Sequence, residues 1–364
     1  GDCVRAHFSN KVEDEDAGFQ VLGSAMIISS SGLPASAASA GGITKSGESQ
    51  DFEWMIPIDE QEGSHMIESH AGRDPSALGL IGAFIVEPRG STYLSPYNGK
   101  SRPDGWMAMI ANDNAKDFRE FVLFYHEVGD ESFRPLNRHG EMIPQRDPLT
   151  DAYRPSARAM NYRSEPFGIN NLAVQDKMFH YEDESLSYSS YTFADVPTTI
   201  PRSYLGDPAK FRLIHGGGEV YHSHHPHGGS IRWTRSPARE PQQANLTYAA
   251  WDGPVKYPVV RTTTDRVDVE VIGPSEALDL ETECGSGLCQ RLAGDFLFHC
   301  HVAHHYVAGM WGYWRVYNTI QNGNYPLGST DVMVPLMELP DRAGRIPQGQ
   351  TSDQLVGKTM DWFG

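Results

Sequence analysis

The chain has 364 residues, of which 39% are hydrophobic, and it carries a formal net charge of -17. This length allows one to three domains, and the acidic charge argues against a nucleic-acid-binding protein. No apolar run approaches the roughly 18 residues that a membrane-spanning helix needs, so we expect no membrane span.

Predicted strands dominate the chain. Glycine and proline are plentiful, at 36 and 24 residues, and turn-rich segments separate short apolar runs, as in antiparallel β-sandwiches. In chain order the runs are CVRAHFSN, FVLFYHEV, AKFRLIHGG, VKYPVVRTT, VDVEVIG, GDFLFHCHV and GYWRVYN. We therefore predict an all-β fold without long helices.

These strands divide into two predicted β-domains. The first covers residues 1–150, and a connector rich in Pro, Arg and Asn follows at 151–185. The second covers 186–320, and residues 321–364 form a Pro- and Gly-rich tail or a linker toward a further domain. The opening GDCVRAHFSN resembles the middle of a β-domain, so we expect the chain to be part of a longer protein.

The four cysteines indicate different roles. Cys284 and Cys289 flank the sequence GSG, which is typical of a hairpin tip, and both a disulfide and two free thiols are compatible with this spacing. A disulfide would indicate an oxidising compartment, hence an extracellular, periplasmic or cell-surface location. Cys3 has no visible partner, and we expect it to be a small buried hydrophobic residue.

The segment GDFLFHCHVAHHYVAGM holds potential metal ligands at fixed offsets. Side chains alternate along a strand, so His299 and His301 should point to one face and Cys300 to the other. One strand can thus serve two metal sites. The Cys300 thiolate, with His305 five residues on and Met310 ten residues on, suits a copper site that has two histidines and a weak axial methionine.

A second motif, VYHSHHPHGG, supplies further histidines. His225 and His227 lie two residues apart on an extended segment, so they share a face and could join His299 and His301 at a second copper centre. His222 could complete the cysteine site. A histidine-rich loop alone can also be an unspecific metal-binding segment, but the pair of motifs favours specific sites.

The strings HSHHPHG and HCHVAHHYVAGM resemble the two copper motifs of the last cupredoxin domain in multicopper oxidases. The resemblance extends over RSYLGDPAKFRLIHGGGEVYHSHHPHGGSIRW and AGDFLFHCHVAHHYVAGMWGYWRVYN, and it includes large bacterial members of the family, among them manganese-oxidising ones. It implies tandem cupredoxin-like Greek-key β-sandwich domains. Residues 186–320 would be the copper-binding domain, and residues 1–150 would carry degenerate copper motifs.

The resemblance also implies a copper-dependent oxidase. A reducing substrate would give single electrons to a type 1 copper, and the electrons would pass through the cysteine to a trinuclear copper cluster that reduces dioxygen to water. The implied ligands of the type 1 copper are His222, Cys300, His305 and Met310. The implied ligands of the cluster are His225, His227, His299 and His301. The implied catalytic residues are Cys300, His299 and His301.

The first domain departs from the family pattern. A trinuclear cluster in this family takes histidines from two further H-x-H motifs, but GSAMIISSSGL has no histidine at the position of the first motif. At the second, HMIESHAGRDP has Glu68 where a histidine is expected and keeps His70, with His65 five residues earlier. His70 is therefore either a remaining metal ligand or an ordinary polar residue. We predict that further cupredoxin domains or subunits supply the missing histidines.

Two other functions stay open from the sequence. One is an enzyme similar to copper nitrite reductases, with a single copper besides the type 1 site. The other is a non-enzymatic cupredoxin module for electron transfer or structure. Copper content separates the three, at about four, two or one ions per active unit. We expect the reducing substrate to be a metal cation such as Mn(II), which suits the acidic charge, or a phenol.

Overall fold

The computed structural model describes most of the chain. The described residues are 2–22, 29–30, 33–34, 42–58, 60–72, 75–102, 104–128, 157–166, 170, 184–193, 195–218, 220–228, 231–236, 268–322 and 335–348.

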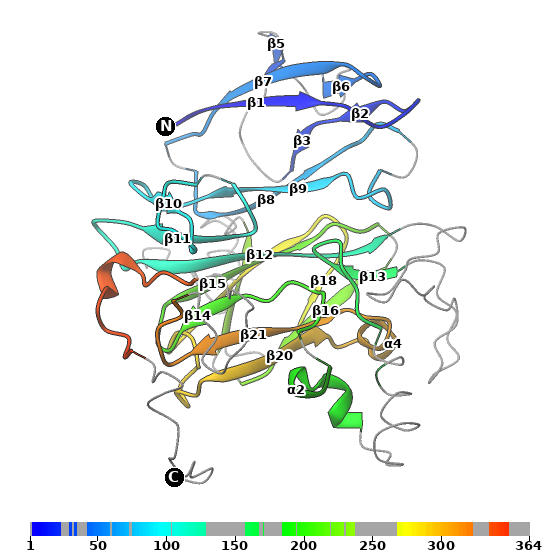
Figure 1. The fold of residues 1–364 in the computed structure, drawn as a ribbon. Coiled ribbons are helices and arrows are strands. Elements are labelled where there is room, and N and C mark those ends of the chain that lie inside the picture. The colour runs from blue at the N-terminus through cyan, green and yellow to red at the C-terminus, as the bar shows by residue number, and fades with distance from the viewer. Residues whose placement is uncertain are drawn as a thin grey trace, which may run out of the picture.

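Strands make up most of the regular structure (Figure 1). In the first part of the chain they are β1 (Cys3–Ser9), β2 (Ala17–Gly18), β3 (Gln20–Val21), β4 (Ser29–Ser30), β5 (Leu33–Pro34), β6 (Ile43–Thr44), β7 (Ser49–Met55), β8 (Gly63–Glu68), β9 (Ile81–Val86), β10 (Thr92–Leu94), β11 (Met107–Ala111), β12 (Phe118–Val128) and β13 (Ala157–Met160). In the second part they are β14 (Arg202–Tyr204), β15 (Ala209–His215), β16 (His222–Pro226), β17 (Ile231–Ser236), β18 (Glu270–Ile272), β19 (Ala277–Thr282), β20 (Gly294–Cys300) and β21 (Trp311–Tyr317). The helices are short: α2 (Ser190–Phe193), α4 (Ala303–Val307) and the 3-10 turns Glu184–Tyr188 and Pro340–Arg342.

Four sheets lie in layers, from the blue strands at the top of Figure 1 to the orange strands at the bottom. The first has the order β1-β7-β4-β5, and the second has the order β3-β8-β9. The third has the order β10-β11-β12-β15-β19-β17, with β13 also paired to β12, and the fourth has the order β14-β21-β20-β16-β18. A separate pair joins β2 and β6. The all-β fold class predicted from the sequence is confirmed by these sheets.

Strand β12 is buried on both faces. Its odd-numbered Phe121, Leu123 and Tyr125 pack toward the fourth sheet, and its even-numbered Val122 and Phe124 pack toward the second. Side chains alternate along a strand, so burial on both faces requires a nearly continuous apolar run. The sequence FREFVLFYHEV meets this requirement.

A buried ion network joins the second and third sheets. The guanidinium of Arg212 on β15 is fully buried, and its nitrogens lie 2.7 Å from Glu62, 2.9 Å from Glu87 and 2.8 Å from Glu120. A fourth carboxylate, on Asp279, lies 3.1 Å away. Lys210 also contacts Glu62, at 2.5 Å, but removal of Arg212 would leave the other buried carboxylates without compensation, so this network holds the layers in one arrangement.

The structure places strands β10, β11 and β12, which the sequence assigned to the first domain, in a sheet with strands of the second. Strand β12 pairs in parallel with β15, with Phe121 opposite Phe211. The predicted strand VKYPVVRTT lies outside the described residues. The division of the chain into domains stays a prediction.

The cysteine pair Cys284 and Cys289 forms a disulfide, with a Cα–Cα distance of 5.0 Å. The expectation that Cys3 is buried was wrong, because it lies on β1 with its side chain on the exposed face. Its thiol contacts Glu53, 3.4 Å away on the neighbouring strand. The alternation of exposed and half-buried residues along β1 explains this, since burial there depends on the face and not on the residue type.

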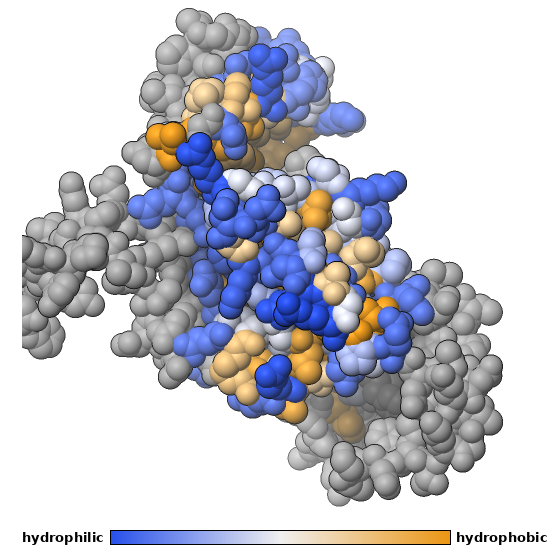
Figure 2. Space-filling view, turned by 90° about the vertical axis from the view of Figure 1, so that its left-hand side faces the viewer, coloured by the Kyte–Doolittle hydropathy of each residue, from blue (hydrophilic) through white to orange (hydrophobic). Residues whose placement is uncertain are grey.

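The surface in Figure 2 is largely hydrophilic, and its hydrophobic residues form small separate groups. Among the described residues, no helix has both the length and the apolar character needed to cross a membrane.

Candidate metal centres

The pairing of β16 with β20 separates two groups of histidines. His224 lies opposite Cys300 in this antiparallel pair, and His225 lies opposite His299. Because neighbouring residues of a strand point to opposite faces, Cys300 lies on the core side and His299 on the other. The sheet thus presents one group of metal-binding side chains on each face.

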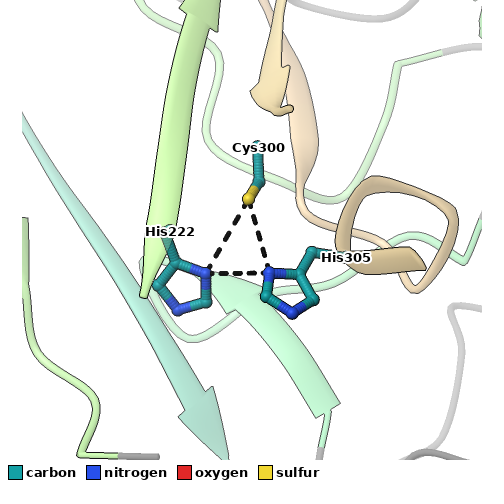
Figure 3. A group of neighbouring side chains, drawn as sticks. All are labelled: His222, Cys300 and His305. Carbon is teal, nitrogen blue, oxygen red and sulfur yellow. Dashed lines mark hydrogen bonds between the residues drawn. The ribbon is translucent and has the colours of Figure 1, made fainter. Parts of the chain in front are cut away.

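The first group consists of His222, Cys300 and His305 (Figure 3). The sulfur lies 3.8 Å from Nδ1 of His222 and 3.5 Å from Nδ1 of His305, and the two nitrogens are 3.2 Å apart. Ligand atoms about 2.0–2.3 Å from one ion in a trigonal arrangement would be separated by about 3.5–3.8 Å. The three side chains are buried, and their donor atoms therefore fit a single ion with little movement.

The loop after β20 brings His305 back to the strand. Helix α4 begins at Ala303, and the chain reverses at Gly309, whose φ of 109° favours glycine. The N–H of Cys300 then donates to the carbonyl of Met310 at 3.0 Å, and the N–H of Met310 donates to the carbonyl of His305 at 3.1 Å. Met310 is fully buried in the same core cluster as Cys300, as a weak axial ligand would be.

Burial sets the protonation states of this group. It raises the pKa of the Cys300 thiol to about 11, even though the N–H of Ser223 donates to the sulfur and opposes the rise. It lowers the pKa of His305 to about 3. The imidazole is therefore neutral at neutral pH with a lone pair for a metal, whereas the thiol needs a nearby cation to lose its proton. A soft sulfur and two imidazoles in a buried pocket suit copper.

The second group consists of His225, His227 and His299. Nε2 of His299 lies 3.2 Å from Nδ1 of His225 and 3.1 Å from Nε2 of His227. The Nδ1 of His299 lies 2.9 Å from the carbonyl of Cys300. A proton on Nδ1 would bond to this carbonyl and would leave the lone pair of Nε2 facing the other two rings.

His301 lies beside the second group but does not converge with it. Its ring centroid is 4.9 Å from that of His225 and 5.6 Å from that of His299, and the residue is exposed. The strand ends at Cys300, so strict alternation does not extend to His301.

The structure does not bring His70 into any convergent group of metal-binding side chains among the described residues. His70 is about half exposed and contacts the carboxylate of Glu68. His65 is buried, and its Nδ1 lies 3.2 Å from the carbonyl of Leu22. The two histidines therefore have local partners in the first part of the chain.

Three buried residues beside the first group could not be identified from the sequence. Glu127 and His215 form a third convergent group with His222. Tyr125 contacts Nδ1 of His224 through its hydroxyl, and both residues are buried. The only signal in the sequence was the carboxylate of Glu127 near the end of the apolar run FREFVLFYHEV. Its contact with His222 could not be known without the order of the strands.

Comparison with solved structures finds multicopper oxidases and copper nitrite reductases. A multicopper oxidase is 16% identical with a TM-score of 0.45, and the alignment covers 87% of this chain and 75% of that chain. A copper nitrite reductase from Nitrosomonas europaea is 15% identical with a TM-score of 0.45, covering 87% of this chain and 80% of that one. The multicopper oxidase mgLAC is 14% identical with a TM-score of 0.46, covering 92% and 79%. No family model matches the sequence, and no curated protein matches it significantly. Because these identities and TM-scores are low, we base the function proposed below on the side-chain geometry.

Proposed function

We propose that the protein is a copper-dependent oxidoreductase that takes single electrons from a reducing substrate at a buried thiolate site. The convergence of one sulfur and two imidazole nitrogens, from Cys300, His222 and His305, carries the proposal. Met310 would be the weak axial ligand. Such a donor set is typical of electron-transfer copper sites.

The second part of the proposal is a multicopper oxidase that reduces dioxygen to water. Bound copper would supply one-electron transfer at the first site and dioxygen reduction at the second. Cys300 and His299 are neighbours in sequence and serve opposite faces of β20, so one peptide unit joins the two sites. The contact between the imidazole of His299 and the carbonyl of Cys300 adds a second connection between the two sites, with fewer bonds between the sulfur and the ring.

A complete trinuclear cluster needs more histidines than the second group provides. We propose that His301 moves into the group when metal binds, and that further domains or subunits contribute the other ligands, with His70 as a candidate from the first part of the chain. The substrate would be a metal cation such as Mn(II) or a phenol. The disulfide supports an extracellular, periplasmic or cell-surface location.

One observation favours a second candidate function. In the second group, three imidazole nitrogens, from His225, His227 and His299, converge among the described residues, and three imidazoles can hold a single ion. That arrangement suits an enzyme with one further copper, similar to copper nitrite reductases.

The test is copper loading of the protein, with absorption and metal content measured together. The loaded protein should show an intense visible band from thiolate-to-copper charge transfer, and Cys300→Ser should remove it. His299→Ala should lower copper content and keep most of the band. His304→Ala, on the same loop but in no convergent group, is the control. A band that survives Cys300→Ser would refute the first site, and about two coppers per active unit, as opposed to about four, would favour the second candidate.

A further inference from the structure

The second ring nitrogen of His222 faces a buried carboxylate. Nε2 lies 2.8 Å from Oε1 of Glu127, and both side chains are almost completely buried. This short contact places the carboxylate directly beside the outer nitrogen of the ring.

The carboxylate of Glu127 packs against Gly217, where the absence of a side chain leaves room for it. A Cβ at this position would lie 1.9 Å from Oε2 and 2.8 Å from Cδ of Glu127. Any larger residue would push the carboxylate out of its place. The turn HGGG after β15 thus provides the space that Glu127 needs beside His222.

His215 fixes the plane of the same ring. Its imidazole stacks on that of His222, with centroids 4.6 Å apart and planes inclined by 23°. Both of its own nitrogens have backbone partners: Nε2 lies 2.6 Å from the carbonyl of Val220, and Nδ1 accepts from the N–H of Gly217 at 3.2 Å. These contacts leave His215 to pack against His222 and not to bind a second ion between it and Glu127.

We propose that Glu127, seated on Gly217, is a positioning residue that keeps the proton of His222 on Nε2 and turns the Nδ1 lone pair toward Cys300 and His305. The inference rests on the proposed metal site. A carboxylate on the outer nitrogen of a metal-binding imidazole fixes its tautomer and orientation and raises its basicity, and its loss typically costs about 10–100-fold in metal affinity.

Two variants test the role by independent routes. Glu127→Gln removes the charge and keeps the size. Gly217→Ala keeps the charge and displaces the carboxylate. Two controls match them. Gly218→Ala changes the next residue of the turn, where a Cβ would meet only Ser76 Oγ at 3.4 Å. Glu120→Gln removes another buried carboxylate of β12, which faces Arg212 instead.

Binding of Co(II), which does not oxidise thiols, is followed through its thiolate charge-transfer and d–d bands, and the reduction potential is measured on copper-loaded protein. We expect Glu127→Gln and Gly217→Ala to weaken Co(II) binding by about 10–100-fold. The potential should rise, since a nearby negative charge favours Cu(II) over Cu(I). The controls should bind like the unmodified protein.

Each outcome of these measurements either supports or refutes the role of Glu127. Unchanged affinity and potential in both test variants would overturn the inference, and so would equal losses in all four variants, which would indicate general packing. If the unmodified protein shows no Co(II) band that depends on Cys300, the proposed function itself is refuted, and the role of Glu127 with it.

Discussion

Gly309 closes the loop that carries His305 and Met310, and its replacement by alanine should open that loop. Its φ is 109°, which costs a residue with a Cβ about 1–3 kcal/mol. The added Cβ would also lie 2.1 Å from Oγ of Ser164 and 2.7 Å from the backbone nitrogen of Glu165. The hydroxyl can rotate, but the backbone cannot move as easily, so overpacking adds a further 1–3 kcal/mol or so. We expect a total loss of about 2–6 kcal/mol in the free energy of unfolding.

Gly294→Ala is the matched control. Gly294 has a φ of 130°, but a Cβ there would have no atom within 4 Å. Gly294→Ala therefore introduces the backbone strain without a steric clash, and we expect it to lower the free energy of unfolding by about 1–3 kcal/mol. Urea denaturation followed by circular dichroism measures both variants, and Co(II) binding shows whether the loop has moved. Equal destabilisation by the two substitutions, with metal binding intact in Gly309→Ala, would refute the reasoning.

Two further predictions concern stability. Burial opposes the charge of Glu62, but Arg212 and Lys210 outweigh it and lower its pKa from 4.5 to about 2. A lowered pKa gives stability that is present above about pH 4.5 and lost as the pH falls toward 2, at most about 3 kcal/mol. In Glu62→Gln the free energy of unfolding should therefore depend less on pH over this range. An unchanged pH dependence would contradict the assignment. Replacement of both Cys284 and Cys289 by alanine should lower the free energy of unfolding by only about 2 kcal/mol, because the loop that they close is short. Thermal unfolding under oxidising and reducing conditions measures this loss. Only the unmodified protein should become less stable when reductant is added.

The first metal group shows how far local spacing can predict a site. The offsets of His305 and Met310 from Cys300 predicted that these residues share one site, and the backbone hydrogen bonds of the loop after β20 bring both residues back beside the strand. Alternation along one strand also separated His299 from Cys300. Both inferences need only local geometry, which a sequence carries directly.

Positions that depend on pairing between distant strands could not be obtained in this way. Glu127 reaches His222 because β12 pairs in parallel with β15 and so lies across from β16, and no pattern in the sequence gives that order. His301 shows a limit of local spacing. It lies beside His299, with ring centroids 5.6 Å apart, but β20 ends at Cys300, so alternation along the strand does not fix the direction of its side chain.

The first metal group joins residues that are far apart along the chain. His222 and Cys300 are separated by 78 positions, and they meet only after β16 and β20 have paired. Closing a loop of this length costs conformational entropy before any stabilising contact has formed. Folds that depend on such long-range contacts therefore form slowly. A newly synthesised chain would therefore offer its thiol and imidazoles to metals separately before it offers them together. For the metal site proposed above, the order in which the chain folds and meets an ion would then influence which metal it retains.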